Sequence, residues 1–88
     1  MKLHEWNSEK NDWLKSNCHI SFEEVMNQIQ SNNIIAQIDH YNQKKYPNQR
    51  IYILKINSYV YMVPFVEDEH KIFLKTIIPN RKATKKYL

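Results

Sequence analysis

The chain of 88 residues contains no glycine. This absence excludes every phosphate-binding motif that is built on glycine, including the P-loop, the dinucleotide-binding fingerprint and the nucleophile elbow. The chain also has a single cysteine, Cys18, so an internal disulfide is excluded, as is usual for proteins of a reducing cytosol. With one cysteine and no glycine elbow, acyl-transfer catalysis has no support in the sequence.

Two further absences narrow the class of protein. No apolar run reaches the length of a signal peptide or a membrane span, so we expect a cytoplasmic protein without membrane contact. The histidines are scattered and no cysteine pair accompanies them, so we expect neither a metal site nor a cofactor. The short length predicts one domain that covers residues 1–88.

What the chain does contain is typical of a packed protein with a basic end. Hydrophobic residues make up 42% and aromatic residues 12%, which is enough for a core, and the formal net charge is +4. The stretch from residue 71 to the end carries six basic residues and no acidic one: Lys71, Lys75, Arg81, Lys82, Lys85 and Lys86. This distribution favours a polyanion or an acidic protein as partner, and a solvated lysine-rich tail is the alternative.

Two helices are expected in the first third of the chain. Asn7 or Ser8 can cap a helix that runs to about Asn17, with Trp13 and Leu14 facing the core. The run from Ser21 to Glu24 has the pattern of a capping box and predicts a second helix that ends near residues 31–33.

Strands are expected in the rest of the chain, at 34–38, 50–56, 59–66 and 71–78. Asn57-Ser58 predicts a hairpin, residues 67–70 predict a second turn, and Pro64 predicts a bulge or a locally unpaired position. Asn80 can cap a short helix over 81–88. We therefore predict an α+β fold: two N-terminal helices, an antiparallel meander of three to four strands and a short C-terminal helix.

The last strand and the C-terminal segment combine phosphate-binding charge with an aromatic ring. Lysine and arginine bind phosphates, and Tyr87 can stack on a base. In a metal-independent ribonuclease, such cations stabilise the charge on the scissile phosphate, and the RNA supplies its own 2′-hydroxyl as nucleophile. A base such as His40 or Glu67 would assist the reaction, although the spacing identifies neither. Among the histidines, His40 is the best candidate for an acid or base, because it lies in a polar loop.

Four short motifs, in the same order along nearly the whole chain, resemble the BrnT family of bacterial type II toxins. They are Glu5-Trp6-Asn7-x-x-Lys10-Asn11, Ile20-Ser21-Phe22-Glu23-Glu24-Val25, Arg50 before a strand, and Ile77-Ile78-x-x-Arg81-Lys82-Ala83-Thr84-Lys85-Lys86-Tyr87. The resemblance implies a RelE-like ribonuclease fold and growth inhibition by RNA cleavage. It also implies neutralisation by a small DNA-binding antitoxin, through which alone the toxin would reach operator DNA.

The leading hypothesis is thus an endoribonuclease toxin that acts on RNA, either free or on the ribosome. Its candidate catalytic residues are His40, Arg50, Lys75, Arg81 and Tyr87, and its candidate RNA-binding residues are Lys82, Thr84, Lys85 and Lys86. Two other hypotheses stay open: a non-enzymatic interaction subunit that binds an acidic partner, and a small RNA-binding module without catalysis.

Overall fold

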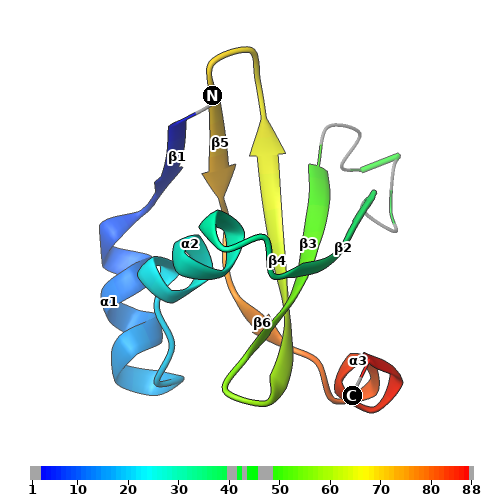
Figure 1. The fold of residues 1–88 in the computed structure, drawn as a ribbon. Coiled ribbons are helices and arrows are strands. Elements are labelled where there is room, and N and C mark those ends of the chain that lie inside the picture. Colours follow the sequence, from blue (N-terminus) through cyan, green and yellow to red (C-terminus); the bar gives the residue numbers. More distant parts are fainter. Residues whose placement is uncertain (1–2, 40–41, 43, 46–48, 88) are drawn as a thin grey trace.

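The computed structural model describes residues 3–39, 42, 44–45 and 49–87, and for Ala83 and Tyr87 the description stops at the backbone. The described residues form an α+β fold with three helices and a six-stranded sheet (Figure 1). The elements are β1 (Leu3–Trp6), α1 (Ser8–Asn17), α2 (Phe22–Gln30), β2 (Ile34–Asp39), β3 (Gln49–Ile56), β4 (Tyr59–Glu67), β5 (Lys71–Leu74), β6 (Ile78–Pro79) and α3 (Arg81–Tyr87).

The predicted architecture of two helices followed by a meander is wrong, because the sheet is larger and mixed. Its order is β1-β5-β4-β3-β2, with β6 also paired to β4. The first strand precedes both N-terminal helices and pairs with β5 in parallel, from Leu3 opposite Lys71 to Trp6 opposite Leu74. A four-residue strand whose partner lies at the far end of the chain leaves no local pattern, so sequence periodicity alone does not reveal it.

The strand expected at 71–78 is divided into β5 and β6, which pair with different parts of β4. The β5 ladder covers Phe65 to Glu67, whereas the β6 ladder covers Tyr61 and Met62. Pro64 lies between these two ladders, where its carbonyl accepts a hydrogen bond from Lys75 N at 2.8 Å. In a strand, the N–H and the carbonyl of one residue point to the same edge. The N–H that Pro64 lacks would therefore face the gap between β5 and β6, where no strand needs it as a donor, so a proline is tolerated in this central strand.

Two local predictions are confirmed. Ser21 Oγ accepts from Glu24 N at 3.3 Å and Glu24 Oε2 accepts from Ser21 N at 2.9 Å, which is the predicted capping box. Asn57 and Ser58 form the predicted hairpin turn between β3 and β4, with φ values of 53° and 63°. Both signals lie within four residues of the structure they specify.

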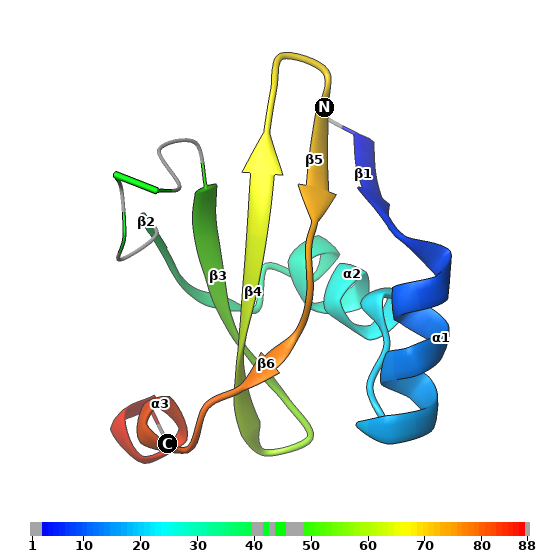
Figure 2. The same cartoon turned by 180° about the vertical axis from the view of Figure 1, so that it is seen from behind.

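Helices α1 and α2 cover one face of the sheet and create the main core (Figures 1 and 2). That core includes Leu14, Phe22, Val25, Leu54, Val63, Phe65 and Leu74. A smaller cluster of Ile51, Ile53 and Val60, with Met62 packed against it, occupies the opposite face. Helix α3 lies next to this cluster, because Asn80 Nδ2 contacts Met62 Sδ at 2.9 Å.

The inward face of α1 differs from the expected one. Leu14 is buried as predicted, but Trp13 is 51% exposed, and Lys10 Nζ lies 4.7 Å from the centre of its ring. Asn11 takes an inward position instead and is only 4% exposed. The helical spacing of three residues from Asn11 to Leu14 places both on the side that faces α2.

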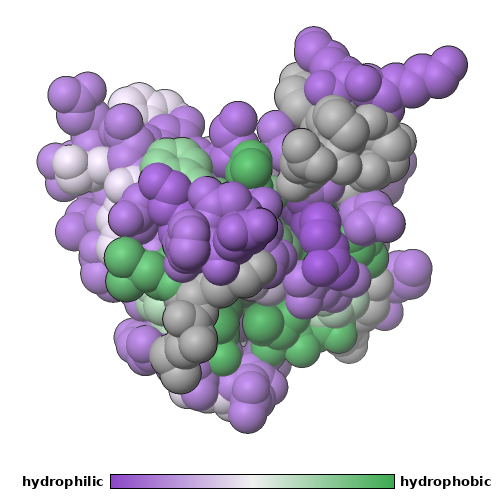
Figure 3. All heavy atoms as spheres, turned by 90° about the horizontal axis from the view of Figure 1, so that it is seen from above, coloured by the Kyte–Doolittle hydropathy of each residue, from purple (hydrophilic) through white to green (hydrophobic). Residues whose placement is uncertain are grey.

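Seen from above, the surface is largely hydrophilic, with hydrophobic side chains in patches between polar ones (Figure 3). None of the helices in the described residues combines the length and the apolar character needed to cross a membrane. The sheet has two ends of different character. The hairpin end carries Asn57–Ser58 and lies at the bottom of Figure 1, and the turn end carries Asp68–His70 and lies at the top.

Candidate nucleic-acid interface

Helix α3 is attached to the first residues of β4 at the hairpin end. Thr84 Oγ1 accepts from Val60 N at 3.0 Å and donates to Asn80 O at 2.8 Å, while Asn80 N donates to Val60 O at 3.1 Å. A helix of seven residues is not stable on its own in water. These bonds therefore fix its position, and the hydroxyl of Thr84, a predicted RNA-binding residue, serves this attachment.

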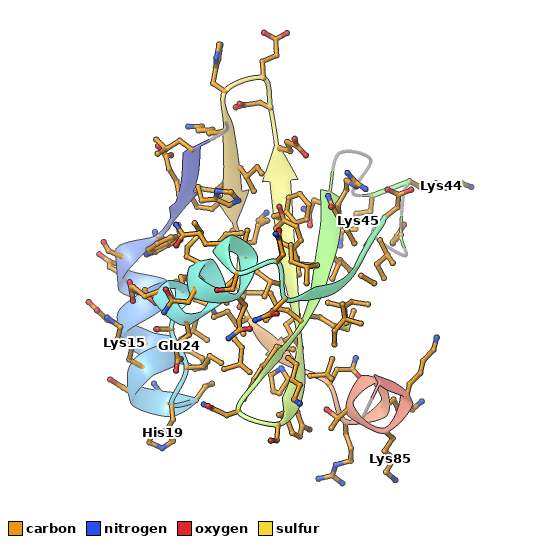
Figure 4. All side chains as sticks on the ribbon, in the orientation of Figure 1. Lys15, His19, Glu24, Lys44, Lys45 and Lys85 are labelled. Carbon is orange, nitrogen blue, oxygen red and sulfur yellow. The ribbon has the colours of Figure 1, made fainter. Side chains whose placement is uncertain are left out.

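The charged side chains of α3 are all cationic and exposed. Neither its first turn nor its last carries an acidic residue, and Lys85 and Lys86 lie in the last turn, where a helix favours positive charge. Lys85 points away from the body of the protein (Figure 4). The exposed Lys55 lies close by, because it is paired in register with Val60. We call the group of Lys55, Arg81, Lys82, Lys85 and Lys86 the α3 surface.

Lys75 lies apart from α3, directly after β5. Its side chain is exposed, and it follows Leu74, whose side chain belongs to the main core. Side chains alternate along a strand, so Lys75 projects from the opposite face, which also carries Met62. Lys75 therefore adds positive charge to the face beside which α3 lies.

Arg50 is not brought to the α3 surface. It lies on β3 opposite Phe65, on the face of the main core and toward the turn end. Its Nε is 3.5 Å from Asp39 Oδ1 and is buried without a hydrogen bond to any described residue. The predicted catalytic residues are therefore divided between two regions of the sheet. His40 and the side chain of Tyr87 lie outside the described residues.

A half-buried histidine at the turn end, His4, is not among the site residues predicted from the sequence. Within the described residues, His4 Nε2 is buried and has no hydrogen-bond partner. Burial lowers the pKa of His4, and the nearby carboxylate of Glu67 opposes this effect. The side chain lines a pocket of about 330 Å³ together with Met26, Ile29, Gln30 and Asn32. A histidine within a four-residue edge strand carries no sequence signal that would identify this pocket.

The charges around the His4 pocket do not favour a polyanion. The β4–β5 turn, which carries Asp68 and Glu69, lies beside the start of β1, because Leu3 N donates to His70 O at 3.2 Å. The pKa of Asp68 is lowered by hydrogen bonds from the backbone of His70 and Lys71, so this carboxylate stays charged. The all-cationic α3 is therefore better suited to contact a polyanion than the acidic β4–β5 turn.

An aromatic pair lies at the hairpin end, on the face of β4 that the sequence alternation predicts, but it is not among the predicted site residues. Tyr59 and Tyr61 lie on the same face of β4 with ring centroids 5.5 Å apart and planes inclined at 57°. Both side chains are half-buried. The alternation of aromatic residues from Tyr59 to Phe65 was visible in the sequence, but it did not indicate which rings would keep contact with solvent.

Comparison with protein-family models, with curated proteins and with solved structures gave no match. No group of three or more His, Cys, Asp or Glu side chains in the described part of the chain is arranged to hold a metal ion. The fold and the site together define a small α+β protein with an exposed basic helix fixed to one end of its sheet.

Proposed function

We propose that this chain is the toxin of a type II toxin–antitoxin system and acts in the cytoplasm as a metal-independent endoribonuclease. The observation that carries the proposal is the α3 surface, a helix of exposed cations that hydrogen bonds hold against the sheet. The resemblance of four ordered motifs to the BrnT family supports it independently. A small antitoxin would neutralise the protein and would connect it to operator DNA.

In this proposal the α3 surface binds the RNA backbone. Arg81 and Lys85 contact phosphates, and their charge stabilises the negative charge that develops when the 2′-hydroxyl attacks the adjacent phosphate. The 2′-oxygen forms a bond to phosphorus, the bond to the 5′-oxygen breaks, and one proton moves from the 2′-oxygen to the 5′-oxygen. Proton transfer is assigned to His40, the sequence-based candidate for an acid or base, and Tyr87 stacks on a base or hydrogen-bonds to the RNA.

The test is induction of the chain in cells that lack a partner, followed by measurement of growth and of RNA integrity. We expect growth arrest and new RNA fragments that end in 2′,3′-cyclic phosphate. Cleavage by the purified protein should persist in a chelator. Normal growth together with intact RNA would contradict the proposal. Co-purification with the product of the adjacent gene, in a complex that weakens as salt is added, tests the antitoxin part.

Binding without cleavage is the second candidate function. It is favoured by the chemistry of this region: the α3 surface consists of cations, and the hydroxyl of Thr84 on the same helix is already engaged with Val60 and Asn80. Such a surface is sufficient to hold a phosphate backbone. This alternative predicts RNA that is retarded by the protein but stays uncut, so the same purified protein distinguishes the two functions.

A further inference from the structure

A pocket of about 440 Å³ lies at the hairpin end of the sheet, where α2 leads into β2. Its size is within the range of small-molecule binding sites. The described residues that line it carry three side-chain amides, one cation and one apolar group: Gln28, Asn33, Asn57, Lys55 and Ile35. None of these lining residues is acidic, so the pocket does not repel a phosphate chain. We call it the amide pocket.

The backbone holds the walls of the amide pocket in place. Helix α2 ends with Asn32 at a φ of 57°, and Asn33 N donates to Gln28 O at 2.9 Å, as in other helix-ending turns. On the opposite wall, Asn57 lies in the tight turn between β3 and β4. The three side-chain amides form no hydrogen bond with any described residue, so their donors and acceptors are available to a ligand.

An irregularity of β2 adds an apolar side chain to the amide pocket. The register of β2 against β3 shifts between Ile34 and Ala36, and Ile35 is 38% exposed. A bulge turns a side chain out of the regular alternation of a strand, and bulges are frequent beside active sites. The pocket therefore offers an apolar contact to the face of a ring, next to amides that can bind the edge of the ring.

Lys55 connects the amide pocket with the α3 surface. It lines the pocket, and it lies directly opposite Val60, so the side chains of both residues are on the same face of the sheet. Val60 is the residue to which Thr84 and Asn80 attach α3. Neighbouring strands are about 4.8 Å apart, and the hairpin turn and α3 lie at the same end of the molecule (Figures 1 and 2). A nucleic-acid strand that follows the cations from α3 to Lys55 therefore reaches the pocket.

We propose that the amide pocket takes one purine base of the RNA whose phosphates the α3 surface holds, so that binding depends on a purine at one position. This inference rests on the proposed function. A side-chain amide can pair with N6 and N7 of adenine, and a lysine can donate to O6 and N7 of guanine. Unpaired bases of RNA leave these edges open to side chains. Pyrimidines lack the N7 acceptor, so they form fewer of these hydrogen bonds.

The test is fluorescence anisotropy with labelled oligoribonucleotides of about twelve nucleotides, within the usual site sizes of single-strand binders. One strand contains only uridine, and the two others carry a single central adenosine or guanosine. Their 2′-O-methyl form prevents cleavage. We expect the wild-type chain to bind at least one of the two purine strands roughly fivefold to a hundredfold more tightly than the all-uridine strand.

A double variant removes two of the three amides. Gln28→Met with Asn33→Ala keeps the helix-forming character of position 28 and the backbone hydrogen bond of position 33, and it should lose the preference for purine strands. The control, Asn27→Ala with Gln30→Met, makes the same substitutions at positions of α2 outside the amide pocket and should keep the preference. In the wild type, the side-chain amide resonances of Asn33 and Asn57 should shift when a purine strand is added, and this measurement requires no variant to fold.

Adenosine monophosphate distinguishes a site for a base of RNA from a site for a free nucleotide. In competition with the labelled adenosine strand, it should bind more weakly than that strand, because it offers the α3 surface only one phosphate. Equal or tighter binding of the mononucleotide would overturn the inference.

The inference is also overturned if neither purine strand binds more tightly than the all-uridine strand, if the folded double variant keeps the preference, or if the amide resonances do not move. In each of these cases the proposed function survives, provided that the wild type binds and cleaves RNA. Failure of the wild type to bind any of the strands overturns the proposed function and the inference together.

Discussion

At the scale of single residues, Asn11 connects the two N-terminal helices. Its Nδ2 donates to both carboxylate oxygens of Glu23, at 2.9 and 2.8 Å, and its Oδ1 accepts from Phe22 N at 2.8 Å. The bond from Asn11 is also the largest cause that lowers the pKa of Glu23. One buried amide thus satisfies a backbone N–H in the first turn of α2 and fixes the angle between the helices.

Replacing Asn11 by alanine should lower the free energy of unfolding by about 1–3 kcal/mol, because the N–H of the buried Phe22 would lose its partner. Urea denaturation measures the loss, and NMR titration should show the pKa of Glu23 returning toward its ordinary value. Asn17→Ala is the control. Its Nδ2 bonds to Trp13 O on the exposed side of α1, so we expect a change within about 0.5 kcal/mol. Equal effects of the two substitutions would contradict the role assigned to Asn11.

His4 makes stability depend on pH. Because burial lowers its pKa below 6.5, the unfolded chain binds the proton more readily than the folded chain does. The contribution of neutral His4 to the free energy of unfolding is therefore fully present above pH 6.5, and it is lost as the pH falls below that value. Between pH 7.5 and 5.0, the wild type should lose more stability in urea than His4→Gln does. Identical pH profiles for the wild type and His4→Gln would refute this expectation.

At the scale of elements, the sequence predicts what a few adjacent residues specify. The capping box before α2 and the turn at Asn57–Ser58 are of this kind, and both were identified correctly. The pairing of β1 with β5 and the division of the last strand depend on contacts between distant segments. No local pattern encodes such contacts, and the predicted meander was wrong for this reason.

The hairpin turn shows how the chain manages without glycine. Asn57 and Ser58 both have positive φ, a conformation that is unfavourable for a side-chain-bearing residue by about 1–2 kcal/mol. Ser58→Gly relieves this strain but adds flexibility to the unfolded chain, so we expect a net gain of roughly 0.5–1 kcal/mol. Ser16→Gly, within α1, should have the opposite sign. The unfolding temperatures of the two variants test this expectation. A lower unfolding temperature for Ser58→Gly than for the wild type would disprove the strain argument.

The attachment of α3 rests largely on one hydroxyl. Thr84→Val preserves the shape of the side chain but leaves Val60 N, at a fully buried residue, without its acceptor. We expect faster exchange of the amide hydrogens of α3 and Val60, and faster tryptic cleavage after Arg81 and Lys82. Thr76→Val, in the connection between β5 and β6, is the control and should leave both rates unchanged. Unaltered exchange in Thr84→Val would show that other contacts hold the helix.

The candidate site was only partly accessible from the sequence. The four cations of α3 lie within the six residues 81–86, so their presence on one helix followed from the sequence directly. The place of Arg50 depended on its strand register, which puts it on the main-core face beside Asp39 and away from α3. The accessibility of Tyr59 and Tyr61 depended on how the helices and β6 pack around β4, which no periodicity indicates.

At the scale of the whole molecule, the charges are unevenly distributed between the two ends of the sheet. The turn end mixes both signs: it carries the acidic residues Asp39, Glu67, Asp68 and Glu69 and the cations Lys44, Lys45, Arg50 and Lys71. Two of these cations are held in ion pairs, Arg50 with Asp39 and Lys71 with Glu5. The hairpin end carries the α3 surface, without an acidic residue in its helix. A polyanion therefore experiences a directed field, and the net charge of +4 underestimates the attraction at one end.

Two double variants of equal net charge separate the local field from the overall charge. Lys82→Gln with Lys85→Gln, and Lys10→Gln with Lys44→Gln, each lower the formal net charge from +4 to +4 − 2 = +2. If each lysine of the first pair contacts one phosphate, the slope of log affinity against log salt for single-stranded RNA should become shallower by roughly 1.4. The second pair lies on α1 and near the turn end, and Lys44 points away from α3 (Figure 4). Its slope should match that of the wild type. Equal losses of RNA affinity in the two double variants would mean that the net charge of the protein governs binding. In that case the position of Lys82 and Lys85 on α3 would contribute nothing beyond their charge.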